Sequence, residues 1–254
     1  MRPSVPVTRP YSNVNSSCES CPIRHRAVCA HCEREELAML EKMKSYKTFE
    51  SGEPIIWAGD PLQFVASVVT GVASISRTME DGRRQMVGLL LPSDFLGRPG
   101  RGFANYDVTA VSKVTLCRFE RAPFENLLKS SPSVSRRLLE MTLDELDAAR
   151  DWMLLLGRKT AREKIASLLA ILARRETILN PKAGETLSMR FDLPITREAM
   201  ADYLGLTIET VSRQITALRK SGVISLEGKR HVIVPDYARL LDEAGDDSDG
   251  GADY

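Results

Sequence analysis

The chain has 254 residues, and its 35 Lys and Arg against 34 Asp and Glu give a formal net charge of +1. With 43% hydrophobic and 27% charged residues it is neither disordered nor collagen-like overall, and no apolar run approaches the ~20 residues of a membrane helix. The charge balance excludes no nucleic-acid partner, because residues 241–254 hold six acids and no Lys or Arg, which leaves +7 on residues 1–240.

The beginning of the chain is polar, and the cysteines that follow it are unusually crowded. Residues 1–17 contain no apolar core, so we expect a disordered segment rather than a signal peptide, in a soluble, cytoplasmic protein. Four of the five cysteines are Cys18, Cys21, Cys29 and Cys32, and the fifth is Cys117. Clustering of this kind in a cytoplasmic protein favours metal or redox chemistry over structural disulfides.

Two kinds of centre suit these cysteines. Two C-x-x-C motifs separated by seven residues suit zinc, which takes four thiolates in a tetrahedron. An iron–sulfur cluster is also held by cysteines, and one of its ligands can be remote in sequence. Cys117 has the position of such a ligand, although a Cys in a β-strand is usually just a small buried hydrophobic residue. The spacing alone leaves both centres open.

Strand-rich sequence occupies about residues 46–120, after a predicted helix over 35–45. Four runs are rich in Val, Ile and Thr and are separated by turns that contain Gly, Pro and Asp. These runs are 54–57, 64–78, 84–91 and 106–119. Short strands at this spacing predict a small β-sandwich or barrel.

Helical sequence resumes after the strands. A short helix is expected over 123–130, a long one from Pro132 to about Arg158, and another over 161–175. In the long helix one set of residues recurs every three or four positions, which is the spacing of a seam between paired helices. The set is Leu139, Thr142, Leu146, Ala149, Met153 and Leu156. Because a helix of ~25 residues is longer than a small domain needs, we favour a homodimer seam over packing within one domain.

Residues 196–222 predict two helices joined by a tight turn, which is a helix-turn-helix. Thr196 and Thr207 have the positions of N-caps, Gly205 lies in the turn, and Gly222 ends the second helix. Two apolar strands around Glu-Gly-Lys follow in residues 223–235 and predict a β-hairpin, or wing.

The second helix of this pair has an apolar face and a separate polar stripe. The apolar face holds Ile208, Val211, Ile215 and Leu218, and the stripe holds Glu209, Ser212, Arg213 and Thr216. In a major groove Arg can bond guanine and Glu can accept from cytosine, and helix-turn-helix proteins read bases near this end of the helix. We therefore expect DNA recognition rather than an ordinary solvated face. Phosphate contacts are expected from Arg197, Lys220, Lys229 and Arg230, with His231 as a further candidate.

Over nearly its whole length the sequence resembles the CRP/FNR superfamily of bacterial transcription regulators. The resemblance is carried by LGLTIETVSRQITALRKSGVI, the strand-rich first half, the long helix and the cysteine cluster. Four segments are similar to the FnrL-type subgroup of oxygen-responsive regulators: CESCPIRHRAVCAHC, RQMVGLLLPSDFLGRPG, LLEMTLDELDAARDWMLLLGRKTAREKIASLL and LEGKRHV.

The resemblance implies an α+β fold in five parts. These are a cysteine-rich cluster segment (1–34), an N-terminal jelly-roll-like β-roll sensor domain (35–130), a dimerisation helix (131–160), a C-terminal winged helix-turn-helix domain (161–240) and an acidic disordered tail (241–254).

It also implies a cofactor. Such regulators carry a [4Fe–4S] cluster on three N-terminal cysteines and one from the β-roll. Here these are Cys18, Cys21, Cys29 and Cys117, with Cys32 as the alternative to Cys29 because the family has a shorter gap before its third Cys. The cluster holds a homodimer together at low oxygen, and oxygen degrades it and loosens the dimer. Relatives have an acidic residue in the seam, which is matched here by Ala149.

The partners are implied in the same way. Glu209, Ser212 and Arg213 match the family's recognition motif and imply palindromic double-stranded DNA with TTGAT-type half-sites. Residues 80–84 match a loop that contacts RNA polymerase, so we expect an activator, although Asp-Gly would serve a plain hairpin turn equally well.

Three other functions fit the sequence less well. A cyclic nucleotide is not expected, because residues 97–110 lack the Arg-Ser pair of nucleotide-binding relatives. Enzyme activity is not expected either, since GRKT at 157–160 lacks the upstream Gly of a phosphate loop and no nucleophile–His–carboxylate pattern is visible. The main alternative is a zinc-stapled winged-helix DNA-binding regulator without redox chemistry.

Overall fold

In the computed structural model, which describes residues 17–179, 188–228 and 230–245, the first half of the chain forms two antiparallel sheets. One has the order β1-β8-β3-β6, with β1 Lys44–Phe49, β8 Val114–Glu120, β3 Phe64–Thr70 and β6 Phe95–Leu96. The other has the order β2-β7-β4-β5, with β2 Pro54–Ile56, β7 Asp107–Ala110, β4 Ala73–Thr78 and β5 Arg84–Leu90. Side chains from both sheets, among them Val68, Leu90 and Leu116, pack into one core. The predicted small β-sandwich is confirmed.

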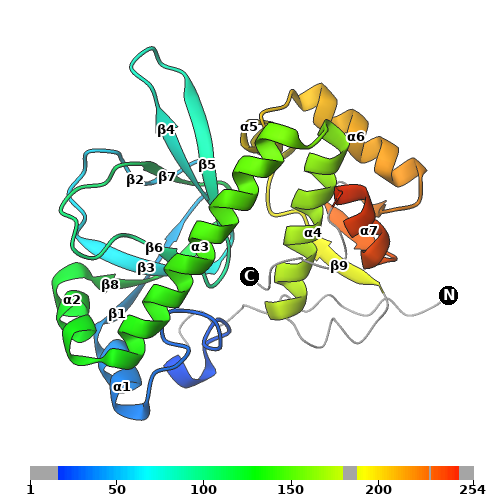
Figure 1. The fold of residues 1–254 in the computed structure, drawn as a ribbon. Coiled ribbons are helices and arrows are strands. Elements are labelled where there is room, and N and C mark those ends of the chain that lie inside the picture. Colours follow the sequence, from blue (N-terminus) through cyan, green and yellow to red (C-terminus); the bar gives the residue numbers. More distant parts are fainter. Residues whose placement is uncertain (1–16, 180–187, 229, 246–254) are drawn as a thin grey trace.

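The strand-rich run over 64–78 forms two strands. β3 ends at Thr70 and β4 begins at Ala73. Between them Gly71 has φ +81°, and a Cβ at this position would clash with the Lys113 carbonyl oxygen. Only glycine fits a backbone position of this kind. The hairpin formed by β4 and β5 extends away from the rest of the fold (Figure 1).

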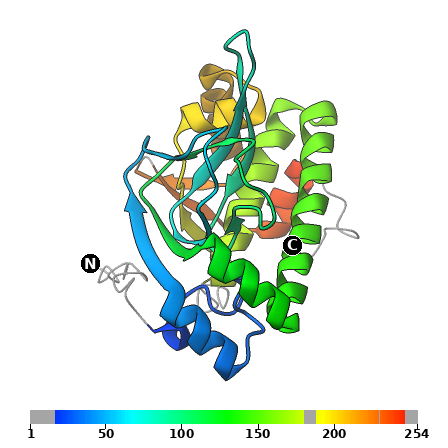
Figure 2. The same ribbon diagram turned by 90° about the vertical axis from the view of Figure 1, so that its left-hand side faces the viewer.

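At the other end of the sheets lie the cysteine segment and the helices next to it (Figure 2). The cysteine segment contains a 3₁₀ helix, η1 Cys18–Ser20, and is followed by α1 Arg34–Met43, whose last residue directly precedes β1. The predicted helix over 35–45 therefore began one residue too late and ended two residues too late. α2 Arg121–Ser130 starts directly after β8.

The long helix, α3 Pro132–Arg158, has the predicted ends. Pro132 stands at its first position, where a missing N–H costs nothing, and the Ser131 side chain accepts a hydrogen bond from Val134 N at 3.4 Å. α3 runs from the cysteine end of the sheets to the C-terminal helices (Figure 1). None of the helices in the described part of the chain is long and apolar enough to cross a membrane.

The C-terminal region contains the predicted helix-turn-helix and wing. Its elements are α4 Ala161–Leu179, β9 Met189–Asp192, α5 Arg197–Leu204, α6 Ile208–Lys220, β10 Ser225–Glu227, β11 His231–Val234 and α7 Tyr237–Ala244. Thr196 and Thr207 accept hydrogen bonds from Ala199 N and Thr210 N, as N-caps do, and Gly205 is left-handed at φ +62°.

Two of these elements were not predicted. β9 pairs with β11, so the wing belongs to a three-stranded sheet of order β10-β11-β9. α7 includes residues 241–244, which the sequence placed in a disordered acidic tail, and it is fixed to α4 by Arg162 and Glu243 at 2.5 Å. The rest of that tail, 246–254, and the predicted disordered residues 1–16 lie outside the described residues.

Candidate functional site

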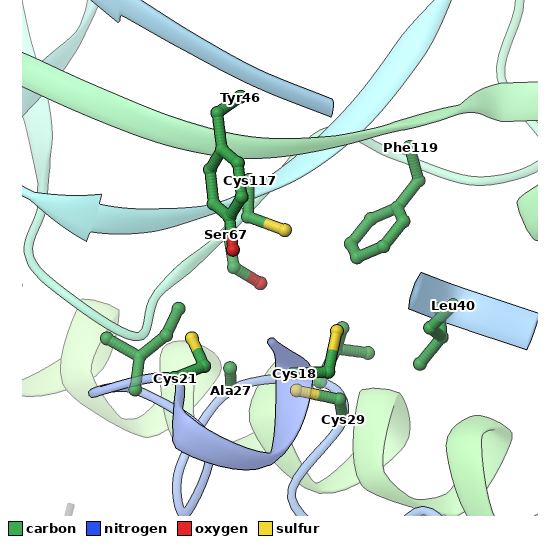
Figure 3. A pocket seen from close by; sticks show the side chains of 11 residues that line it. Cys18, Cys21, Ala27, Cys29, Leu40, Tyr46, Ser67, Cys117 and Phe119 are labelled. Carbon is green, nitrogen blue, oxygen red and sulfur yellow. The ribbon is translucent and has the colours of Figure 1, made fainter. Parts of the chain in front are cut away.

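Four cysteines line one small cavity on the face of the β1-β8-β3-β6 sheet that is turned away from the second sheet (Figure 3). Cys18, Cys21 and Cys29 come from the N-terminal segment, and Cys117 comes from β8. In Figure 3 the four sulfur atoms are turned toward the space between that segment and the sheet. Cys32 is not among the residues that line the cavity, although it packs against the same apolar cluster.

Two polar side chains complete a wall that is otherwise apolar. Tyr46 on β1 and Ser67 on β3 are both register partners of Cys117 on β8, so three adjacent strands present these side chains on one face. Ser67 is 2% exposed, and its Oγ has no hydrogen-bond partner within the described residues. Nothing in the sequence distinguishes either residue from an ordinary strand residue, and neither was predicted.

The cysteine segment is held in place by burial and by one arginine. Ile23, Ala27 and Val28 are each 1% exposed in the cluster that surrounds the cavity. The Arg24 guanidinium donates to the carbonyl oxygens of Cys29, of Ala30 at 2.6 Å and of Cys32 at 3.1 Å. Those bonds close the loop and fix Cys29 at the cavity.

Burial makes it costly to ionise these thiols. It raises the pKa of Cys29 to about 11, despite the nearby Arg24 guanidinium, and it raises the pKa of Cys32 to about 12. The pKa of the Cys117 thiol is also raised by burial, and further by the negative charges that Cys21 and Cys18 would carry. A cationic centre among the sulfur atoms would offset both effects. Lys44 contributes one positive charge from the edge, with Nζ 3.5 Å from Cys18 Sγ.

Within residues 17–179, 188–228 and 230–245, no three His, Cys, Asp or Glu side chains are arranged so that they could hold one metal ion. The four cysteines instead surround a common space.

The segment that carries the cysteines is bonded to the start of α3. Arg137 on α3 donates to the Arg26 carbonyl oxygen at 2.7 Å. Glu36 on α1 accepts hydrogen bonds from the hydroxyls of Ser131 and Ser133, the latter at 2.5 Å. A displacement of the cysteine segment would therefore act directly on the first two turns of α3.

The predicted DNA-reading stripe lies on the outer face of α6. Glu209, Arg213 and Thr216 are exposed and Ser212 is half-buried. Val211, Ile215 and Leu218 are buried, as predicted. The prediction for Ile208 was wrong, since this first residue of α6 is 46% exposed.

The predicted phosphate contacts differ in exposure. Lys220 and Arg230 are exposed, and Lys229 lies outside the described residues. Arg197 is half-buried, burial lowers the pKa of its guanidinium, and one of its terminal nitrogens is buried with no hydrogen-bond partner in the described part of the chain. His231 Nδ1 lies 2.9 Å from Asp192 Oδ1, so its ring is engaged within the sheet.

The predicted seam on α3 is mostly an exposed apolar stripe. Leu139, Leu146 and Met153 are 59%, 45% and 65% exposed, and Thr142 and Ala149 are exposed between them. Leu156 differs, since it is half-buried and packs against the C-terminal core of its own chain. Exposed apolar residues in such a row indicate an interaction surface. Leu143 and Leu154, which also lie on the surface, broaden the stripe.

The turn at residues 80–84 closes the projecting β4–β5 hairpin. Met79 N donates to the Arg83 carbonyl oxygen at 2.8 Å, and the Arg83 and Asp81 side chains form an exposed ion pair at 2.7 Å. The plain hairpin turn expected from the Asp-Gly pair is present, and its position leaves the charged tip accessible to another molecule (Figure 1).

Comparison with known proteins matches two parts of the chain to known domain families. A model of the cyclic nucleotide-binding domain matches residues 46–131, and a model of the Crp-like helix-turn-helix domain matches residues 163–243. Among solved structures, FixK2 from Bradyrhizobium japonicum has a TM-score of 0.70 and 31% identity, over 82% of this chain and 99% of that one.

Several transcription regulators are similar over most of their length. The transcriptional activator protein FnrL of Cereibacter sphaeroides is 68% identical, over 92% of this chain and 94% of its own. The nitrogen fixation regulation protein FixK of Bradyrhizobium diazoefficiens is 40% identical over 89% and 92%. The transcriptional activator protein anr of Pseudomonas aeruginosa is 29% identical over 92% and 94%.

Proposed function

Since the chain belongs to the CRP/FNR family of transcription regulators, we propose that it is an oxygen-responsive activator whose DNA-binding form is a homodimer that holds a [4Fe–4S] cluster. Its relatives are DNA-binding transcription regulators, so the proposal concerns what this one senses and how. The observation that carries it is the single cavity lined by Cys18, Cys21, Cys29 and Cys117.

The residues around the cavity fit an iron–sulfur cluster. Cysteine thiolates are the usual ligands of such clusters, and one ligand remote in sequence is compatible with them. The apolar wall keeps water away, and the unpartnered Ser67 hydroxyl is a donor available to a sulfur acceptor. Cys29 lines the cavity and Cys32 does not, which supports Cys29 as the third ligand. Cys117 lines the cavity and Cys32 does not, which favours a cluster over the zinc alternative built on the two C-x-x-C motifs.

Loss of the cluster would affect the dimerisation helix α3 through the cysteine segment. When bound, the cluster supplies iron–sulfur bonds that join this segment to β8 and that oxygen can break. Arg137 and Glu36 bond the same region to the start of α3, so release of the segment removes support from that helix. A small effect suffices, because about 1.4 kcal/mol changes a dimerisation constant tenfold.

The exposed stripe of α3 is the proposed dimer interface, with Leu139, Leu146 and Met153 as its apolar contacts. Two copies would then read a palindrome with half-sites about 34 Å apart. Ala149 stands where relatives are expected to have an acidic residue, so the repulsion that makes their dimers conditional would have to come from the neighbouring Asp147 and Asp151.

For the DNA itself, we propose TTGAT-type half-sites read by Glu209, Ser212, Arg213 and Thr216. Lys220, Lys229 and Arg197 are the proposed phosphate contacts. The charged turn at 80–84 is the proposed contact with RNA polymerase, and no cyclic nucleotide is part of the proposal. The boundaries of the five predicted parts of the chain stay a prediction.

The decisive experiment is purification without oxygen. We expect brown protein with about four iron and four sulfide per monomer, which elutes as a dimer and binds a TTGAT palindrome. Exposure to air should bleach the colour and weaken DNA binding together. Colourless protein that contains stoichiometric zinc and binds DNA equally well in air would overturn the oxygen-sensor proposal in favour of the zinc-stapled regulator.

A further inference from the structure

Ser67 has a chemically unusual position. Five buried side-chain atoms in the described part of the chain have no hydrogen-bond partner, and Ser67 Oγ is the one that belongs to the wall of the cysteine cavity. A buried hydroxyl without a partner costs free energy that a methyl group would not. Packing therefore does not explain why a serine stands here.

The strand around Ser67 shows what packing alone would select. Along β3, Ala66 and Val68 face the core between the two sheets. On the opposite face, Val65 and Val69 belong to the apolar cluster around the cysteines, and Ser67 stands between them. A single hydroxyl thus interrupts a row of valines at the point where β3 passes the cavity.

The hydroxyl is placed beside the one cysteine that comes from the β-roll. Ser67 is the direct register partner of Cys117 in the antiparallel pair β3·β8, and directly opposed side chains in such a pair are close neighbours on one face. In Figure 3 the Ser67 oxygen is turned toward the same space as the Cys117 sulfur. Ser67 is 2% exposed, so its hydroxyl is shielded from bulk solvent.

We propose that Ser67 is a positioning residue that donates a hydrogen bond from Oγ to a sulfur atom of the bound cluster, either the Cys117 thiolate or an inorganic sulfide. The inference rests on the proposed function, since it needs a cluster in the cavity. Hydrogen bonds to the sulfur atoms set the reduction potential of iron–sulfur clusters. A donor stabilises the more negatively charged, reduced state, so this hydroxyl raises the potential and slows oxidation by oxygen.

The test compares Ser67→Ala with wild type, Ser67→Thr and Ser74→Ala. Thr keeps the hydroxyl. Ser74 is also 2% exposed, but it lies on β4 and its hydroxyl donates to the Thr109 carbonyl oxygen at 3.4 Å, away from the cavity. After anaerobic purification, the rate of bleaching is measured at a fixed oxygen concentration, together with the reduction potential and the iron–sulfur stretching frequencies.

Ser67→Ala should bleach about three- to tenfold faster than wild type, the effect expected of one net hydrogen bond, with a lower potential and shifted stretching frequencies. Ser67→Thr and Ser74→Ala should behave as wild type in bleaching. Without the cluster the effect of the substitution should not be harmful. Cluster-free Ser67→Ala should be at least as resistant to heat as cluster-free wild type, because it lacks the buried hydroxyl that has no hydrogen-bond partner. A purely structural serine would instead lower the stability of both forms.

The outcomes separate the two proposals. Wild type without iron and sulfide would overturn the proposed function. A wild type that carries the cluster, with Ser67→Ala unchanged in bleaching rate, potential and spectrum, would overturn the role of Ser67 alone. Ser67→Ala could also lose the cluster altogether. If Ser67→Thr retains it and the cluster-free alanine variant stays folded, that result would support the proposed role of the hydroxyl.

Discussion

At the scale of single residues, Cys29 and Cys32 lie three positions apart in one loop and yet have different surroundings. The Arg24 guanidinium bonds the carbonyl oxygens of both. This arrangement puts the Cys29 side chain at the cavity and leaves that of Cys32 outside its lining. The two cysteines are therefore a matched pair for testing the ligand set.

We predict that Cys29→Ala abolishes the cluster and that Cys32→Ala retains it. The measurement is iron and sulfide per monomer after anaerobic purification, with Cys117→Ala as the variant in which the ligand from β8 is lost. Retention of the cluster in Cys29→Ala together with its loss in Cys32→Ala would reverse the assignment.

Arg213 supports a second prediction at this scale. It is exposed on α6 beside Glu209, where a guanidinium can bond guanine in the major groove. Arg213→Ala should weaken binding to a TTGAT palindrome by about 1–3 kcal/mol and relax specificity at the contacted base. Binding is measured at one fixed salt concentration on that duplex and on a random one.

The control is Arg219→Ala, which removes an arginine that is also exposed, from the last turn of the same helix. We expect it to weaken both duplexes alike or neither. If Arg213→Ala also weakens both duplexes equally, Arg213 contacts phosphate and does not read a base.

The sequence could predict the cysteines and the α6 stripe because each has a local spacing. It could not choose between Cys29 and Cys32, because the choice depends on how Arg24 folds the loop. Nor could it predict Ser67, whose place in VASVV resembles the polar side of any strand. Its importance comes from Cys117 on another strand, and that pairing is a property of the sheet register.

At the scale of elements, prediction succeeded where local signals agree and failed where an element depends on its neighbours. α3 has the predicted ends because Ser131 and Pro132 mark its start and its apolar residues recur every three or four positions along its length. β9 is four residues long and exists by pairing with β11. The second half of α7, residues 241–244, looks like acidic tail in the sequence, yet Leu240 and Ala244 are buried against the C-terminal core.

The ion pair that fixes α7 supports a pH-dependent prediction. Glu243 and Arg162 form two contacts, at 2.5 and 2.7 Å, and the hydrogen bond from Arg162 lowers the pKa of Glu243 below its usual 4.5. A carboxyl with a lowered folded pKa stabilises the fold above its unfolded pKa and loses that contribution as the pH falls through the folded value. Its stabilising effect is therefore complete at pH 7 and absent in strong acid.

Glu243→Gln should lower stability at pH 7 by about 0.2–1 kcal/mol, since both side chains are about a quarter exposed and solvent screens the pair. The difference from wild type should shrink as the pH falls below 4.5. Thermal unfolding across this range is the measurement, and Asp242→Asn, an exposed neighbour on the same helix, is the control. An equal loss at every pH would show that the charge of Glu243 plays no part.

At the scale of the whole molecule, α3 touches both ends of the fold. Near its start Arg137 bonds the cysteine segment, and near its end Trp152 stacks on Tyr203 of α5 with ring centroids 3.7 Å apart. A second link joins Asp94, in the loop after β5, to Arg175 on α4 at 2.9 Å. Each pair joins segments far apart in sequence, so no local pattern could predict it. Together they provide a continuous path from the cysteine cavity to the helix-turn-helix.

The stripe on α3 lies along the middle of that path and supports the last prediction. Leu146 is 45% exposed at the centre of the stripe, and in a homodimer the same residue from both copies would meet near the two-fold axis. Leu146→Glu places two like charges in an apolar interface, so the anaerobic protein should elute as a monomer. The cluster should remain, because Leu146 lies outside the cysteine cavity.

Mass, iron content and DNA affinity are measured on the same anaerobic sample, with Met79→Glu as the control. Met79 is an apolar residue of similar exposure, 54%, at the tip of the β4–β5 hairpin, and its variant should stay dimeric. Loss of the dimer should reduce affinity for the palindrome far more than affinity for a single half-site. In a dimer, binding of one copy raises the effective concentration of the other at the second half-site, and a monomer lacks this effect. A Leu146→Glu protein that remains dimeric with unchanged affinity would place the interface on another surface and leave the exposed stripe without a role.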